Sequence, residues 1–220
     1  MAWQAIAGPA IILAALSCAT PAGSGQGPFA VGSPDGSLSI ALTLKAMPQP
    51  YAAGERAYYR VTYMGKPVLA DSPLGLDLLG GEPLDRDFEV LGAAEKSGDS
   101  TWENPFGGKR VIPDRWNELT VSLREKFGAK RRVDIVLRAY DEGVAFRYVL
   151  PEQEAIGEFT LASENTQFHF AGEAFAFALD RGRFNTDNEG EYVRRPLAGI
   201  KPASIINLPL LVELPGAGLW

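Results

Sequence analysis

The side chains that most often carry catalysis or bind transition metals are scarce in this chain of 220 residues. It contains one cysteine, Cys18, and one histidine, His169. These counts exclude intrachain disulfides and zinc sites with several Cys and His ligands, and they argue against a Cys-His nucleophile pair. Any metal site would therefore need oxygen ligands.

Asp141 and Glu142 are adjacent carboxylates that could be considered as an acid–base pair. They stand directly before Gly143, and Asp-Glu-Gly is ordinary turn chemistry in which neighbouring side chains point apart. A general acid and a general base must both reach the reacting atoms. We therefore interpret the two residues as part of a hairpin turn and not as a catalytic site.

Two other residue types could contribute to binding. His169 lies between Phe168 and Phe170 in an alternating segment and faces away from both, which predicts an exposed or hydrogen-bonded histidine and not a catalytic base. Trp102 and Trp116 bracket a stretch rich in glycine and proline. Aromatic rings can stack on sugars, but core packing is the prediction for both tryptophans.

The composition excludes several classes of protein. Hydrophobic residues make up 46% and charged residues 22%, values that fit neither a disordered tail nor a membrane bundle. The formal net charge of -6 repels phosphate backbones, so nucleic acid is not an expected partner. A basic cluster around one predicted turn is interpreted as a solvated hairpin tip and not as a polyanion site. Its members are Arg124, Lys126, Lys130, Arg131 and Arg132, interrupted by Glu125.

Residues 1–22 are predicted to be a signal peptide for export. An apolar stretch around 11–16 precedes small residues suited to a signal peptidase near Ala19 or Ala22. The apolar run is shorter than the roughly 20 residues that a spanning helix needs, and Pro9 interrupts it, so no membrane span is expected. Residues 23–28 then form a flexible leader. The expected location is periplasmic or secreted; a mobile apolar N-terminus is the alternative, because no Lys or Arg precedes the apolar run.

The remainder of the chain predicts a mainly β fold. From residue 36 onward, short alternating runs are separated by Gly, Pro, Asp and Asn, and no helix of ordinary length is indicated. In residues 37–44 the apolar side chains of Leu38, Ile40 and Leu42 share one face, as in a half-buried strand. Strands are predicted at 29–31, 37–44, 57–64, from 66 onward, 119–126, 132–140, 144–150 and 172–179, and those between 118 and 150 form a meander.

Several short segments occur in a specific order along the chain. The most informative is RAYDEGVAFRY at 138–148, joined by SPDG at 33–36, YMGKPVL at 63–69, NEL at 117–119, ENTQFHF at 164–170, NEGEY at 188–192 and LPLLVE at 208–213. Any one of them alone would be weak evidence. As an ordered set covering roughly residues 27–220, they resemble the N-terminal domain of glycoside hydrolase family 97, which places the domain at 29–220.

The resemblance implies an antiparallel β-super-sandwich like that of galactose mutarotase. In complete family members this domain precedes a (β/α)8 barrel that carries most of the catalytic carboxylates, and then a small β domain. The members are exo-acting α-glucosidases or α-galactosidases that act on α-linked oligosaccharides. The chain stops where the barrel would follow, so the resemblance implies a fragment or a truncated reading frame that is inactive alone.

The resemblance also implies one metal ligand. The family domain contributes a glutamate to a calcium site from a segment resembling Tyr-Glu-x-x-Tyr, and counting back three from Tyr192 gives Glu189. Asn188 stands in place of the first tyrosine, so the assignment stays open between Glu189 and Glu191. Calcium takes six to eight oxygen ligands, so the barrel would have to complete the shell. From the residues alone, the alternative is an acidic surface loop.

Two classes of function follow from these observations. The first is a non-catalytic domain of an exported α-glycosidase that packs on the barrel and lends a calcium ligand. The second is a freestanding carbohydrate-binding β-sandwich module. An enzyme in its own right is a third and weaker interpretation, because a glycosidase needs two carboxylates about 5 to 10 Å apart and no such pair stands out.

Overall fold

The computed structural model describes residues 27–47, 49–187 and 189–216, so the predicted signal peptide and residues 23–26 of the leader lie outside the described residues. The described part contains strands, one 3-10 turn η1 (Leu197–Gly199) and no α-helix, and none of its helices is long and apolar enough to cross a membrane. The strands are β1 (Phe29–Gly32), β2 (Leu38–Ala46), β3 (Glu55–Tyr63), β4 (Lys66–Pro73), β5 (Leu76–Leu78), β6 (Phe88–Glu103), β7 (Val111–Glu125), β8 (Arg132–Tyr140), β9 (Val144–Val149), β10 (Leu161–Glu164), β11 (Phe175–Ala178), β12 (Val193–Pro196) and β13 (Leu211–Glu213).

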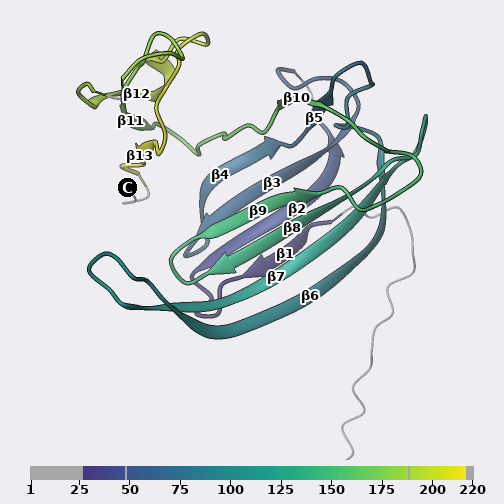
Figure 1. Ribbon diagram of the computed structural model, residues 1–220, viewed down its shortest axis with the longest axis horizontal. Helices are drawn as coiled ribbons and strands as arrows, with labels where there is room; N and C mark the ends of the chain where they lie inside the picture. The colour runs from purple at the N-terminus through teal and green to yellow at the C-terminus, as the bar shows by residue number, and fades with distance from the viewer. Residues whose placement is uncertain (1–26, 48, 188, 217–220) are drawn as a thin grey trace, which may run out of the picture.

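Two four-stranded antiparallel sheets pack against each other (Figure 1). The first has the order β1-β2-β3-β4 and the second β6-β7-β8-β9, while β5 and β10 form a small ribbon. One apolar cluster joins the facing sides, with Ile40 and Leu42 from the first sheet and Val121, Leu123 and Leu137 from the second. Each of these five side chains is fully buried. The predicted mainly β, antiparallel sandwich is therefore confirmed.

The predicted strands agree with the structure wherever apolar residues alternate. β8 has the predicted bounds, β2 and β3 differ from the predictions by one or two residues at each end, and β9 ends one residue early. β1 pairs with β2, and β7, β8 and β9 form the predicted meander. β2 and β8 bury alternate residues along one face, so their sequences carry the period of two that a pleated strand requires.

The turn between β3 and β4 shows why the sequence places glycine there. Tyr63 pairs with Lys66, which leaves Met64 and Gly65 as a two-residue loop with φ of 49° and 74°. Positive φ at both central residues is the conformation that matches the twist of the flanking strands, and glycine adopts it without a Cβ clash. The strands predicted at 57–64 and from 66 onward are therefore joined as a hairpin.

The turn between β1 and β2 is tied to the turn between β8 and β9. The Asp35 carboxylate accepts hydrogen bonds from the Ser33 hydroxyl at 2.6 Å and the Ser37 amide at 2.9 Å. The Asp35 amide in turn donates to the Asp141 carboxylate at 2.8 Å. The hydrogen bonds from Ser33 and Ser37 lower the pKa of Asp35 from 3.8 to about 2. Asp141 therefore braces two turns at one end of the sandwich, in agreement with its interpretation as a turn residue.

We expect Asp35→Ala to destabilise the chain at neutral pH and to lose this effect in acid. The pKa of this carboxyl is lower in the folded state, about 2, than the unfolded value of about 3.9. Its contribution to stability is therefore fully present at pH values above about 3.9 and is lost as the pH falls through about 2. Urea unfolding at several pH values measures the difference between variant and parent. Asp99→Ala, which removes an exposed aspartate of β6, should show no such trend. A pH-independent difference for Asp35→Ala would contradict the prediction.

β6 and β7 form a hairpin much longer than the other strands. Their pairing continues from Gly92 opposite Ser122 to Glu103 opposite Val111, and the tip projects past the sandwich on the left of Figure 1. Trp102 lies on this extension with 52% of its surface exposed. The prediction of core packing is therefore wrong for Trp102, because most residues of the extension are exposed in the described structure.

The chain beyond residue 174 forms a small unit of its own, here called the C-terminal unit (residues 174–214). Its sheet has the order β12-β11-β13, and Leu211 and Leu214 line a hollow together with Val61 and Val144 of the sandwich. The segment that leads to it runs beside β4, where the Ala70 amide donates to the His169 carbonyl and the Asn165 amide to the Gly75 carbonyl. The predicted strand at 172–179 is confirmed as β11, with Ala176 and Ala178 fully buried.

Candidate functional site

The two predicted calcium ligands lie on the loop between β11 and β12. Arg181 organises the first half of this loop, since its guanidinium donates to the carbonyls of Phe184 at 3.1 Å and Thr186 at 2.9 Å. The Arg181 amide also donates to the Ile205 carbonyl at 2.8 Å. The loop is therefore held by its own backbone acceptors and by the segment before β13.

The second half of the loop is fixed around Gly190. A Cβ at this position would lie 2.6 Å from Leu179 Cδ1, so the backbone packs directly on the buried Leu179 side chain. The Tyr192 hydroxyl accepts a hydrogen bond from Asn207 at 3.2 Å. Glu189 and Glu191 stand on either side of this packed glycine, and both are exposed. The fold thus presents two carboxylates on the surface of the C-terminal unit.

This loop does not form a complete metal centre within the described part of the chain. Among those residues, no group of three or more His, Cys, Asp or Glu side chains could hold a metal ion. Carboxylate oxygens are the donors that calcium prefers, so the residue types fit, but two exposed glutamates cannot supply six to eight oxygens. The assignment of calcium to Glu189 or Glu191 stays a prediction.

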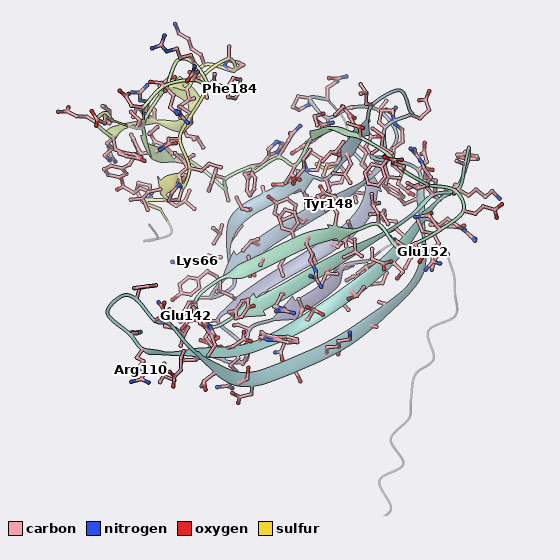
Figure 2. The ribbon with its side chains drawn as sticks, viewed as in Figure 1. Lys66, Arg110, Glu142, Tyr148, Glu152 and Phe184 are labelled. Carbon is pink, nitrogen blue, oxygen red and sulfur yellow. The ribbon has the colours of Figure 1, made fainter. Side chains whose placement is uncertain are left out.

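Large apolar side chains are exposed on the same unit. Figure 2 shows Phe184 on its outer margin, at the loop that carries the two glutamates. Exposed apolar side chains that gather on one small unit mark a candidate interaction surface. Its members, with their exposed fractions, are Phe184 at 84%, Leu208 at 77%, Tyr192 at 48%, Val193 at 47% and Leu211 at 46%.

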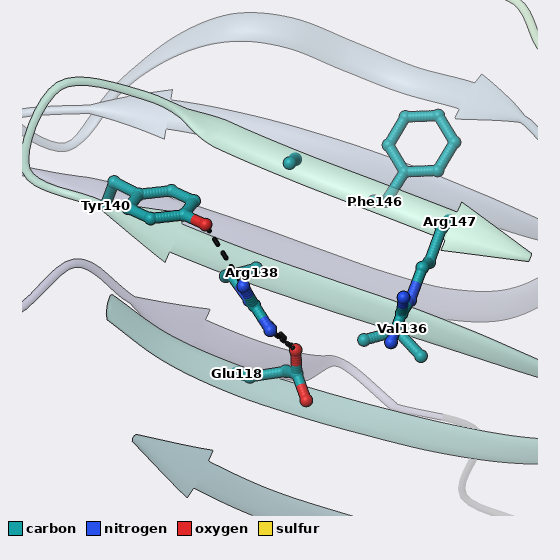
Figure 3. Close-up of a pocket in the computed structure, with 7 residues that line it drawn as sticks. Glu118, Val136, Arg138, Tyr140, Phe146 and Arg147 are labelled. Carbon is teal, nitrogen blue, oxygen red and sulfur yellow. Dashed lines mark hydrogen bonds and ion pairs between the residues drawn. The ribbon is translucent and has the colours of Figure 1, made fainter. Parts of the chain in front are cut away.

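A second candidate is a small pocket of about 150 Å³ on the outer face of the second sheet (Figure 3). The polar side chains that line it form hydrogen bonds with one another. Arg138 donates to the Glu118 carboxylate at 2.9 and 2.5 Å and to the Tyr140 hydroxyl at 3.1 Å. Its guanidinium also stacks 3.8 Å from the centre of the Trp116 ring. The prediction of core packing is wrong for Trp116 as well, because it packs under Arg138 on the outer face.

The basic cluster beside β7 and β8 is only partly a solvated hairpin tip. Arg131 is 8% exposed and pairs with Glu125 at 2.5 Å while donating to the carbonyls of Glu82 at 2.8 Å and Pro83 at 3.1 Å. The interpretation as solvent-facing is therefore wrong for Arg131, which has a structural role. Lys130 and Arg132 are exposed as predicted.

The structure agrees with the sequence-based interpretation of Asp141 and Glu142 as turn residues and of His169 as a hydrogen-bonded histidine. Asp141 and Glu142 lie in the bend between β8 and β9, and Glu142 is exposed. His169 is hydrogen-bonded, with Nδ1 2.9 Å from the Tyr51 hydroxyl and Nε2 2.7 Å from the Gln167 side-chain oxygen. Its surroundings include a cavity that the sequence did not indicate.

The fold and the candidate site together define an antiparallel β-sandwich domain with an appended three-stranded sheet that exposes an acidic loop and apolar side chains. A family model described as "Glycosyl-hydrolase 97 N-terminal" matches residues 31–220. The chain belongs to this family, which confirms the resemblance found in the sequence.

Curated relatives of the chain are much longer than it is. A retaining alpha-galactosidase of Bacteroides thetaiotaomicron is 24% identical over 197 residues, covering 86% of this chain and 27% of the relative. A probable retaining alpha-galactosidase of Streptomyces bingchenggensis is 29% identical over 173 residues, covering 79% of this chain and 24% of the relative. The chain therefore spans about a quarter of the length of these proteins.

A solved structure supports the fold. A glycoside hydrolase family 97 enzyme from Pseudoalteromonas sp. strain K8, in complex with panose, matches with a TM-score of 0.71 and 24% identity. The match covers 84% of this chain and 26% of that enzyme. The homologous structure thus includes a large region with no counterpart in this chain.

Proposed function

We propose that this chain is the non-catalytic N-terminal domain of an exported, exo-acting α-glycosidase. In this function the C-terminal unit packs on a catalytic (β/α)8 barrel that takes α-linked oligosaccharides, and Glu189 or Glu191 lends a ligand to a calcium ion shared with the barrel. The β-super-sandwich of galactose mutarotase type and an α-galactosidase activity, as in the names of the curated relatives, are parts of the same proposal.

One observation carries the proposal: the acidic loop and the exposed apolar residues lie on the same small unit. Phe184 belongs to the loop itself, and Tyr192 and Val193 directly follow Glu191. A partner that covers these apolar side chains would also approach both carboxylates. Such a partner could bring the further oxygen ligands that calcium needs, whereas a freestanding binding module gives no reason for this combination.

The proposal is tested by separating the domain from the rest of a family enzyme. We expect this chain alone to hydrolyse neither p-nitrophenyl α-galactoside nor the α-glucoside, because in this proposal the carboxylates that hydrolyse the glycosidic bond belong to the barrel. We also expect it to bind the separately produced remainder of the Bacteroides thetaiotaomicron enzyme, and Phe184→Ser to weaken this binding about tenfold. Calorimetry measures the association.

Phe106→Ser is the matched control, since Phe106 on the β6–β7 hairpin is 82% exposed and Phe184 is 84% exposed. It should leave the association unchanged. The relative's own N-terminal region shows whether the remainder is folded. Turnover by this chain alone, or failure to associate when the relative's own region associates, would contradict the proposed function.

A further inference from the structure

A cavity of about 320 Å³ lies on the outer face of the first sheet, away from the C-terminal unit. Such a volume is at the lower end of the range of about 300 to 1,000 Å³ found for ligand pockets. Its walls come from the segment before β3, from β3 itself, from the end of β4 and from the segment that follows β10. Its lining includes Tyr51, Arg56, Tyr58, Asp85, Asn165, Gln167 and His169.

Aromatic rings form one wall of the cavity and are held in place. The Tyr51 ring packs edge-on against Tyr58, with centroids 5.4 Å apart, and lies 5.3 Å from the His169 ring. The Tyr51 hydroxyl contacts His169 Nδ1 at 2.9 Å and the Asp71 carbonyl at 3.1 Å. This wall is therefore a fixed aromatic surface, joined by hydrogen bonds to the edge of the first sheet.

The charges in the lining cancel. Arg56 and Asp85 are both buried and form an ion pair across the cavity wall. Neither a free cation nor a free anion would therefore find an uncompensated opposite charge among these lining residues. Asp85 also accepts a hydrogen bond from Arg86 Nε at 2.8 Å, so its carboxylate is fully paired and the lining offers no uncompensated carboxylate to a ligand.

Several polar groups of the lining have unused hydrogen-bonding capacity. Tyr58 is 1% exposed and Arg56 is 8% exposed, yet the Tyr58 hydroxyl and Arg56 Nε have no hydrogen-bond partner within the described structure. Unpartnered buried polar groups are costly. Because both atoms are fully buried, a ligand or a water molecule in the cavity would reach them only after a local shift of the wall. Burial raises the pKa of Tyr58, so its hydroxyl remains a neutral donor and acceptor.

Two side-chain amides at the mouth of the cavity also favour an uncharged, polar ligand. Asn165 and Gln167 are exposed, and each uses its side-chain oxygen, toward Ser163 and His169 respectively. Their NH2 groups make no hydrogen bond to another described residue, so they are free to donate. Neutral donors and acceptors beside an aromatic wall are the groups that recognise a ring bearing hydroxyl groups.

We propose that this cavity is a binding site for a neutral sugar, of the size of a monosaccharide or the end of an oligosaccharide. The Tyr51 and His169 rings would contact the apolar face of the sugar, and the Asn165 and Gln167 amides would donate to its hydroxyl groups. None of these residues belongs to the C-terminal unit, so the proposal stands independently of the calcium ligand.

The single histidine of the chain gives a direct test. In an untagged full-length chain, the imidazole NMR signals come from His169 alone, and His169 lines the cavity. We expect glucose, galactose or maltose to shift these signals in a saturable way. The absence of a saturable shift with all three sugars would overturn the proposal and would leave an aqueous cavity only.

Variants at the mouth of the cavity make the test specific. We expect Asn165→Ala and Gln167→Ala each to weaken sugar binding about five- to tenfold, the range for loss of one hydrogen bond. Asn207→Ala removes an amide of the C-terminal unit and should not change the affinity. Sugar binding that is unaffected by both mouth variants, with unchanged thermal unfolding, would also overturn the site. Because the experiment needs no barrel and no calcium, its outcome is separate from that of the proposed function.

Discussion

Glu189→Gln, made in a full-length family enzyme that carries this domain, is expected to weaken calcium binding at least about tenfold and to lower activity in parallel. A carboxylate offers calcium a full negative charge, whereas the amide of glutamine offers only a dipole. In the isolated chain the same change should have no measurable effect on calcium binding, because two exposed glutamates supply too few oxygens to hold the ion.

Titration calorimetry on both proteins, with activity measured at increasing calcium, checks this prediction. Glu191→Gln is the matched variant, since Glu189 and Glu191 are exposed on either side of Gly190. An effect confined to Glu191→Gln would move the ligand to that residue. Normal calcium affinity in both variants, or tight calcium binding by this chain alone, would contradict the shared site.

The strands that bury one face were predictable from the sequence. In β2, buried Ile40, Leu42 and Leu44 alternate with less buried neighbours, and β8 likewise alternates at Val133 and Ile135. The hydrophobic effect acts on every second residue of such a strand, so the pattern is visible without any knowledge of the partner strand. The fold class follows from these strands alone.

β6, the longest strand, was not predictable in the same way. After Phe88 it reads EVLGAAEKSGDSTWE, and most of its residues are exposed. With neither face buried, no period of two is required, and the backbone pairing with β7 holds the strand instead. The same exposure explains why Trp102 is not a core residue.

The sugar-binding cavity could not be predicted because its residues are distant in sequence. Tyr51 and His169 meet across a separation of 118 residues, and Arg56 and Asp85 across 29. His169 reaches Tyr51 because the segment after β10 runs beside β4, and Asp85 reaches Arg56 from the segment between β5 and β6. No local pattern indicates either arrangement. The acidic loop, in contrast, was singled out because one short segment resembles the family pattern Tyr-Glu-x-x-Tyr, which points to Glu189 or Glu191. Only the relation of these residues to the exposed apolar side chains needed the structure.

Arg131 shows a further limit of sequence patterns and gives the last prediction. Within a run of basic residues it cannot be distinguished from Lys130 or Arg132, yet it alone of the three is buried. The difference comes from the carbonyls of Glu82 and Pro83, 49 and 48 residues earlier in the chain. These carbonyls and the Glu125 carboxylate together satisfy the guanidinium.

We therefore expect Arg131→Met to lower the free energy of unfolding by about 3 kcal/mol, because it leaves the Glu125 carboxylate buried without its partner. The Glu125 side chain is only 12% exposed, so water cannot replace the lost hydrogen bonds fully. Arg131→Lys should fall between parent and Arg131→Met, since one ammonium group cannot reach the carboxylate and both carbonyls together. Urea unfolding monitored by circular dichroism measures all three.

Arg132→Met is the matched control, because Arg132 is the next residue and is exposed at the start of β8. Its effect should stay within about 0.5 kcal/mol, as for most surface substitutions. Adding Glu125→Gln to Arg131→Met should recover part of the lost stability, because the second change removes the unpaired charge that the first one creates. Equal stability of Arg131→Met and Arg132→Met would mean that the Arg131–Glu125 pair contributes no more than an ordinary surface contact. If the effects of Arg131→Met and Glu125→Gln on the free energy of unfolding simply add in the double variant, the loss would instead come from the contacts of Arg131 to Glu82 and Pro83.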